Sequence, residues 1–167
     1  MKRTALLTAF VAVMGLVFGS TGLKGEDEDN GLRTRLTGFQ EVPPILTNGK
    51  GTLTLTIGSS SIAYTLTFSD LSSSATMSHI HFGERGVSGA IFVFLCGGGG
   101  KPTCPAGGGT VTGTITGADV LAVPAQGITA GSFTDLLRIL RSGDAYANVH
   151  TTDHLAGEIR GQISPED

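Results

Sequence analysis

The 167-residue sequence has no tryptophan, only two cysteines and few charged residues, which make up 15% of the chain. Eleven basic residues against 14 acidic ones give a net charge of -3, which argues against nucleic acid as a partner. A G-x-S-x-G nucleophile elbow is missing, and the glycine run at residues 97–100 lacks the Lys-Ser/Thr of a phosphate-binding loop. We therefore expect a binding protein rather than a conventional enzyme.

The N-terminus has the features of an export signal. Lys2 and Arg3 give a basic start, residues 4–18 are apolar, and small residues follow from Gly19 onward. These features predict a signal peptide over residues 1–22. The alternative is an uncleaved membrane anchor, because the apolar run lacks a clear Ala-x-Ala cleavage site.

After the signal, residues 26–29 are all acidic, and we predict that residues 23–31 form an acidic flexible tether. The folded domain then spans residues 32–164. Loss of residues 1–19 removes two basic residues and no acidic one, so the net charge becomes -5. The domain is expected to be secreted or periplasmic.

The two cysteines, Cys96 and Cys104, flank a segment that contains four consecutive glycines. In an oxidising compartment this spacing favours a disulfide that closes a loop with high conformational entropy. The alternative is a pair of thiolate metal ligands, which would require a reducing compartment or further cysteines.

From residue 32 onward, apolar and polar residues alternate with the period of two that is typical of strands. Two clear runs, at residues 51–57 and 62–68, are separated by a Gly-Ser-Ser-Ser segment and predict a hairpin. Residues 90–95 form a continuous apolar run that suits a buried strand. Further strands are predicted near residues 145–150 and 158–163.

Only one stretch has the pattern of a helix. Ser132 and Asp135 form a capping pair, apolar residues follow, and Gly143 ends the segment. About eight short strands with 26 glycines and one short helix predict an all-β protein, a Greek-key antiparallel β-sandwich or flattened barrel.

Three stretches of the sequence resemble the CHRD (chordin-like) domain, a module of chordin and of exported bacterial proteins. They are L-T-G-F-Q-E-V-P-P at residues 36–44, H-I-H-F-G with two later glycines at residues 79–89, and Y-A-N-V-H-T followed by G-E-I-R-G-Q at residues 146–162. The resemblance implies a secreted immunoglobulin-like or superoxide-dismutase-like β-sandwich. It implies no established activity.

All four histidines lie in these motif regions. His79 and His81 are two apart, so on a strand they project from one face while Ile80 projects from the other. Asn148 and His150 share a strand face in the same way. A hairpin around residues 151–157 would make the polar residues of the last two strands cross-strand neighbours, with His154 in the connecting loop.

This arrangement suggests a transition-metal site, since neutral imidazole nitrogens suit copper and zinc. The candidate ligands are His79, His81, His150 and His154, with copper expected before zinc. Residues expected to orient these ligands are Asn148, Glu158 and Arg160. In the alternative, the histidines bond to the backbone and Glu158 and Arg160 form a surface ion pair.

Two other functions remain open. The His79-x-His81 pair, the loop disulfide and Arg160 are similar to features of copper/zinc superoxide dismutases, in which an arginine helps to attract the anion, although the bridging histidine and the zinc ligand set are not recognisable. A metal-free module could instead bind an extracellular protein or matrix partner through its loops or a sheet edge. We expect a monomer in either case.

Overall fold

The computed structural model describes residues 30–165. The predicted signal peptide and nearly all of the predicted tether therefore lie outside the described residues. The nine strands are β1 (Gly31–Thr37), β2 (Lys50–Ile57), β3 (Ser61–Ser69), β4 (Ala75–Phe82), β5 (Ala90–Cys96), β6 (Gly109–Thr116), β7 (Ala145–Thr151), β8 (Ile159–Gln162) and β9 (Ser164–Pro165). One α-helix, α1 (Phe133–Ser142), and three short 3₁₀ helices complete the described chain. This confirms the predicted all-β class with a single short helix.

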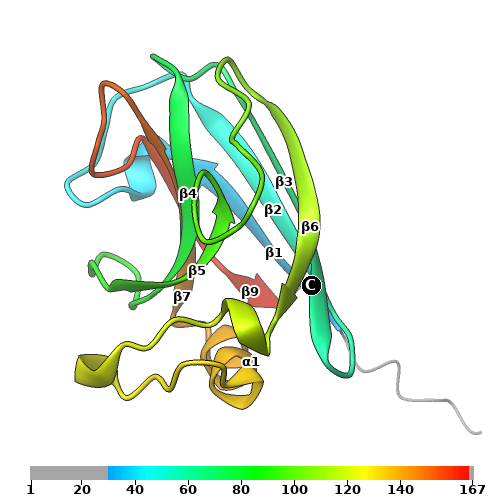
Figure 1. The fold of residues 1–167 in the computed structure, drawn as a ribbon. Coiled ribbons are helices and arrows are strands. Elements are labelled where there is room, and N and C mark those ends of the chain that lie inside the picture. The colour runs from blue at the N-terminus through cyan, green and yellow to red at the C-terminus, as the bar shows by residue number, and fades with distance from the viewer. Residues whose placement is uncertain (1–29, 166–167) are drawn as a thin grey trace, which may run out of the picture.

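The strands form one antiparallel sheet that folds into two facing layers. The order along the sheet is β5-β4-β7-β8-β1-β2-β3-β6, and the two-residue β9 pairs with β1. In Figure 1, β1, β2, β3 and β6 lie on one side and β4, β5 and β7 face them from the other. The connections from β3 to β4, β5 to β6 and β6 to β7 join strands that are not neighbours, as in Greek-key folds.

The predicted hairpin is the pair β2 and β3. Its register joins Leu53 to Leu66 and Leu55 to Tyr64, so the apolar side chains of both strands lie on one face. These side chains are buried between the layers, whereas the threonines between them lie on the outer face. The strict period of two in the sequence thus separates core from surface in this layer.

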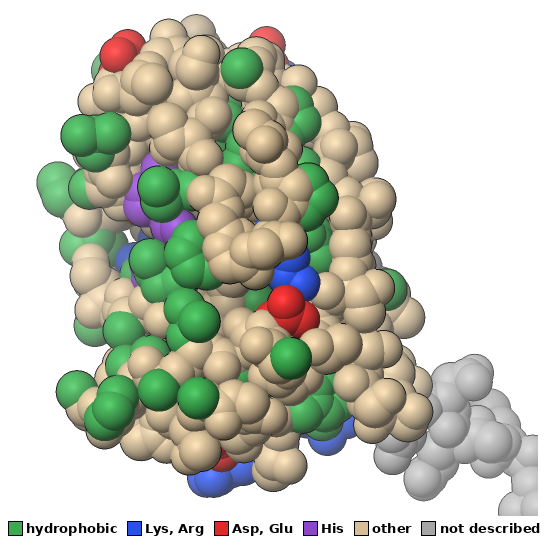
Figure 2. Space-filling view, in the orientation of Figure 1, with side chains coloured by type: hydrophobic (Ala, Val, Ile, Leu, Met, Phe, Trp, Pro, Cys, Tyr) green, Lys and Arg blue, Asp and Glu red, His purple; other side chains and the backbone are tan. Residues whose placement is uncertain are grey.

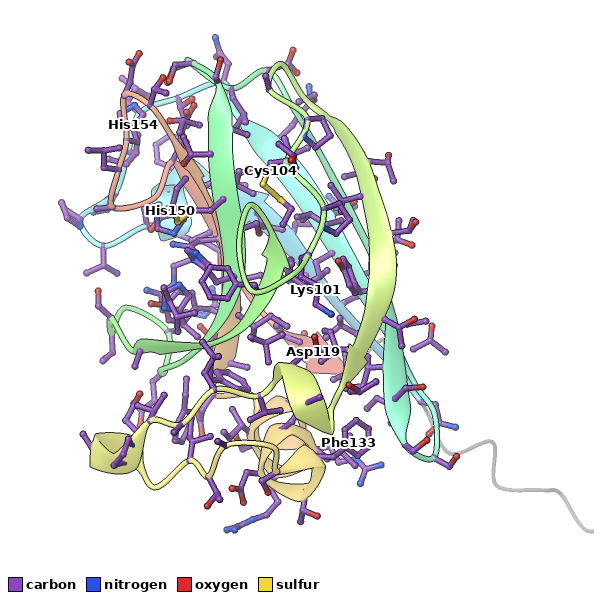
Figure 3. The ribbon with its side chains drawn as sticks, viewed as in Figure 1. Lys101, Cys104, Asp119, Phe133, His150 and His154 are labelled. Atoms are coloured by element: carbon purple, nitrogen blue, oxygen red, sulfur yellow. A yellow bond between two sulfur atoms is a disulfide. The ribbon has the colours of Figure 1, made fainter. Side chains whose placement is uncertain are left out.

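The two ends of the sheet, β5 and β6, are connected by a loop that contains the disulfide. Cys96 and Cys104 are bonded, with Cα atoms 5.1 Å apart, which confirms the predicted disulfide and excludes the two thiolates as metal ligands. Figure 3 shows Cys104 and Lys101 in this loop. Lys101 Nζ lies 2.7 Å from Asp119 Oδ1 and donates to the carbonyl of Thr114 in β6, so the loop is also held at its middle.

Helix α1 covers one end of the sandwich, at the bottom of Figure 1. The Ser132 side chain accepts a hydrogen bond from the backbone N–H of Asp135, and Gly143 ends the helix with a φ of 80°. Leu136 and Leu140 are buried against the core. No helix within residues 30–165 has the length and apolar character needed to cross a membrane.

Candidate metal centre

The outer face of the second layer carries the polar residues of β4, β7 and β8. The register pairs His79 with Asn148 and His81 with Tyr146, and it pairs Asn148 with Arg160 on the other side. This confirms that the polar residues of β7 and β8 are cross-strand neighbours. The β4–β5 register shifts at two points, one directly before His79 and one directly before His81.

Three of the four histidines converge. One ligand atom from each of His79, His81 and His150 lies within 4.8 Å of the others. The ring of His79 is 5.4 Å from that of His81 and 4.7 Å from that of His150, centroid to centroid. All three side chains are buried, and Figure 2 shows histidine side chains in a recess of the left flank beside hydrophobic side chains.

The backbone fixes the orientation of two of the rings. His81 Nδ1 lies 3.0 Å from the carbonyl oxygen of Gly89, and His150 Nδ1 lies 2.9 Å from that of Leu155. A carbonyl can only accept, so each Nδ1 carries the hydrogen, and a neutral ring then has its lone pair on Nε2. A ring that donates Nδ1–H to a backbone carbonyl and presents Nε2 is the usual form of a metal-ligating histidine.

Both Nε2 atoms face the side chain of Asn148, with distances to Oδ1 of 3.1 Å from His81 and 3.0 Å from His150. Two neutral rings have only two N–H groups, and both are used by the backbone carbonyls. As placed, lone pairs of three atoms meet at Asn148; a cation would satisfy them, and so would a half-turn of the amide that points its NH₂ group at both Nε2 atoms.

Neither ring nitrogen of His79 has a hydrogen-bond partner among the described residues, although both nitrogens are buried. On one side the His79 ring contacts an apolar group, the ring of Phe94, with centroids 4.7 Å apart. A buried polar group without a partner is costly, and native proteins usually pair such groups with protein, water or an ion. His79 is thus the histidine of the cluster whose two ring nitrogens lack a hydrogen-bond partner within residues 30–165, although the Asn148 side chain is close enough to raise its pKa against the effect of burial.

The histidines are neutral near pH 7. Burial, together with smaller contributions from the neighbouring His150 and His81, lowers the pKa of His79 to about 3. Burial also lowers the pKa of His81, to about 4, and that of His150. A metal ion would therefore not have to displace a proton from any of the three ligands.

A stack of side chains supports His81 from behind. Its ring lies parallel to that of Tyr146, with an interplanar angle of 5° and centroids 4.6 Å apart. The guanidinium carbon of Arg160 lies 3.4 Å from the centroid of the Tyr146 ring. Arg160 also donates to the carbonyls of Glu84 and Val87, so the β4–β5 loop is tied to the same stack.

His154 and Glu158 lie apart from the three histidines. His154 is in the β7–β8 loop, where its backbone carbonyl accepts from Thr151 and Gly157, and Figure 3 shows it above His150. The Glu158 carboxylate accepts hydrogen bonds from Thr47, Ser72 and Thr151, at 2.6 to 2.8 Å. Burial alone would raise the pKa of Glu158, but these hydrogen bonds hold it below its usual value.

The alternative of a surface ion pair between Glu158 and Arg160 is wrong for the described structure. Both side chains are buried, and each has other partners. The Glu158 carboxylate ties two loops to β7, namely the loop before β2 through Thr47 and the loop before β4 through Ser72. It therefore does not orient a histidine. Arg160 packs on the ring of Tyr146, which stacks on His81, and its charge also contributes to the lowered pKa of His81.

Sequence reasoning missed Glu41. Its side chain is 7% exposed, and Oε1 has no hydrogen-bond partner among the described residues. Burial raises the pKa of Glu41 to about 7, against the lowering influence of Arg160 and of the Val42 amide. The sequence feature that could have indicated a role for Glu41 is its place as the acidic residue of the Q-E-V-P-P stretch, which lies far from the histidines in sequence.

Comparison with family models gives a match to the CHRD domain over residues 32–163. The chain belongs to the CHRD domain family. The three motifs that carried the resemblance supply most of the site, because CHRD residues 36–44 contain Glu41 and the other two contain the histidines, Asn148 and Arg160. Comparison with curated proteins and with solved structures gave no match.

Proposed function

We propose that this CHRD domain is an exported binding module that holds a copper ion through His79, His81 and His150. The observation that carries the proposal is the convergence of three buried neutral imidazoles, one of which has no other partner. The family and the disulfide fit an extracellular or periplasmic location.

Copper is proposed before zinc for a chemical reason. Three imidazoles suit either ion, and for a given set of nitrogen ligands Cu²⁺ binds more tightly than Zn²⁺. The backbone carbonyls that hold His81 and His150 and the stack behind His81 are the kind of outer-shell support that fixes ligating histidines.

Binding is favoured over dismutation by the position of Arg160. An arginine that attracts an anion needs access to solvent, whereas Arg160 is 2% exposed and its guanidinium packs on Tyr146. The superoxide dismutase hypothesis therefore loses the residue that was expected to guide the substrate.

The test is metal content and affinity of the exported form, by elemental analysis and by titration with Cu²⁺ and Zn²⁺. Wild-type protein should bind one ion, and the His79→Ala/His150→Ala double variant should lose that ion. His154→Ala is the matched control, because it removes an imidazole from the loop outside the cluster. Absence of stoichiometric binding, or equal binding by the double variant, would refute the proposal.

A second candidate is a metal-free module that binds an extracellular protein or matrix component. Two loops near the site, β1–β2 and β7–β8, carry exposed apolar side chains, an arrangement that is common where a partner docks. Phe39 is 69% exposed, Leu46 89% and Leu155 77%. This function would predict that Phe39→Ser and Leu155→Ser abolish partner binding while removal of the histidine cluster leaves it unchanged.

A further inference from the structure

We propose that Glu41 is the anionic residue of the metal centre and that it stabilises a bound divalent cation through the side chain of Asn148. This inference rests on the proposed function, since it assigns a further residue to the same site. Glu41 belongs to the β1–β2 loop, which lies outside the strands that carry the histidines.

The geometry places the Glu41 carboxylate beside Asn148. A Cβ atom at Gly157 would lie 2.9 Å from Asn148 Nδ2 and would clash with Glu41 Oε1. Glycine at position 157, with a φ of 126°, thus leaves the space in which the carboxylate and the amide approach each other. The amide has Oδ1 toward the histidines and Nδ2 on the side of Glu41.

This orientation of Asn148 suits a cation at the histidines. The partial negative charge of Oδ1 faces the ring nitrogens, and the partial positive charge of the NH₂ group lies near the carboxylate. A cation on one side and an anion on the other both favour this direction of the amide dipole. Asn148 can therefore transmit the charge of Glu41 to the centre without a direct contact.

The charge balance of the site gives an independent reason. Three neutral imidazoles contribute no negative charge, and the buried guanidinium of Arg160 adds a positive one. A bound divalent ion would raise the local positive charge further, and buried charge without compensation is strongly unfavourable. Glu41 is a nearby carboxylate that no hydrogen bond commits elsewhere at Oε1.

The other buried glutamate of the described chain shows what a structural role looks like. Glu158 accepts hydrogen bonds at both carboxylate oxygens, from three residues in three segments. Glu41 is also buried, but its Oε1 has no hydrogen-bond partner within residues 30–165. A carboxylate that holds loops in place would accept hydrogen bonds at that oxygen. A carboxylate that stabilises a metal ion through its charge does not need them.

The experiment compares Zn²⁺ with the monovalent, redox-inert probe Ag⁺ in the full exported domain. Glu41→Gln should weaken Zn²⁺ binding about tenfold, the size usual for a residue outside the ligand set. Ag⁺ binding should weaken only about threefold, because the ion–carboxylate energy scales with the charge of the ion. Glu84→Gln is the matched control, since it removes the same charge from an exposed position in the β4–β5 loop and should change neither affinity.

A change in the Zn²⁺ to Ag⁺ affinity ratio distinguishes an electrostatic role from a merely structural one, which would weaken both ions alike. Gly157→Ala is the second variant, because its methyl group would displace the carboxylate and the amide without removing a charge, and it should shift the ratio in the same direction. An unchanged ratio in the folded variants overturns the inference about Glu41. If wild-type protein binds neither ion, the proposed function itself fails.

Discussion

The two layers of the sandwich have outer faces of the same sequence pattern but of opposite environment. On β2, β3 and β6 the outer side chains are mostly threonines in contact with solvent, and Thr67 and Thr110 hydrogen-bond across the strands at 3.0 Å. On β4 and β7 the outer side chains include three histidines, Asn148 and Tyr146, and these five are buried. The outer face of β2, β3 and β6 is exposed to solvent, whereas the outer face of β4 and β7 is covered by loops.

The difference shows that a polar strand face becomes a site when loops exclude water from it. Loops β1–β2, β4–β5 and β7–β8 supply Glu41, the carbonyl of Gly89 and the carbonyl of Leu155 to the covered face. Without water, every polar group there needs a protein partner or an ion. The threonine face has no such requirement.

The largest difference between the faces is expected for substitution of a polar side chain by alanine. Glu158→Ala should lower the free energy of unfolding by about 3 kcal/mol, since it leaves the buried hydroxyl of Thr151 unpaired and removes the hydrogen bonds that hold Thr47 and Ser72. Thr65→Ala on the open face should change it by less than about 0.5 kcal/mol. Urea unfolding measures both, and similar values for the two variants would contradict the comparison.

The next effect is a dependence of stability on pH that arises from the buried histidines of the covered face. The pKa of His79 is lowered to about 3 from an ordinary 6.5, so the unfolded chain binds a proton that the folded state does not. Stability is therefore complete above pH 6.5 and falls as the pH decreases. In metal-free protein, His79→Gln should remove about 2 kcal/mol of the loss between pH 6.5 and 4.5. Unfolding curves at the two pH values provide the measurement, and an unchanged slope would refute the buried neutral state of His79.

A smaller effect of opposite sign is expected for Glu41. Its pKa is raised to about 7 from 4.5, so between these values the folded state keeps a proton that the unfolded chain has released. Stability from this group is therefore complete below pH 4.5 and is lost as the pH rises through about 7. Metal-free Glu41→Gln should exceed wild type in stability at pH 8 by about 1 to 2 kcal/mol and by much less at pH 4.5. A constant difference across the pH range would argue against a buried carboxylate.

The sequence was sufficient to predict the class of fold, because period-two alternation marks strands wherever one face is apolar. The β2–β3 hairpin, the capped helix after Ser132 and the Cys96–Cys104 disulfide follow from local signals of this kind. The His79-x-His81 pair and the position of His150 on the next polar face were also accessible from strand periodicity.

The remaining parts of the site depend on which loops cover the face, and no local pattern encodes this. His154 lies only four residues beyond His150, yet the loop turns it away from the cluster. Glu158 follows the strand alternation, but its carboxylate meets hydroxyl groups from distant loops instead of a histidine. Glu41 comes close to Asn148 only because Gly157 leaves room between them.

The junction between β5 and β6 affects how the molecule meets other copies of itself. Both strands are sheet ends, where free backbone groups could pair with a strand from another chain. The segment after β6 occupies part of this edge, since Leu121 donates to the carbonyl of Phe92 and Gln126 accepts from Ala90. Lys101, held in the disulfide loop, binds the Thr114 carbonyl on the opposite strand. The disulfide loop therefore covers part of the β6 edge, and we expect reduction of Cys96–Cys104 to leave this edge freer to pair with another chain.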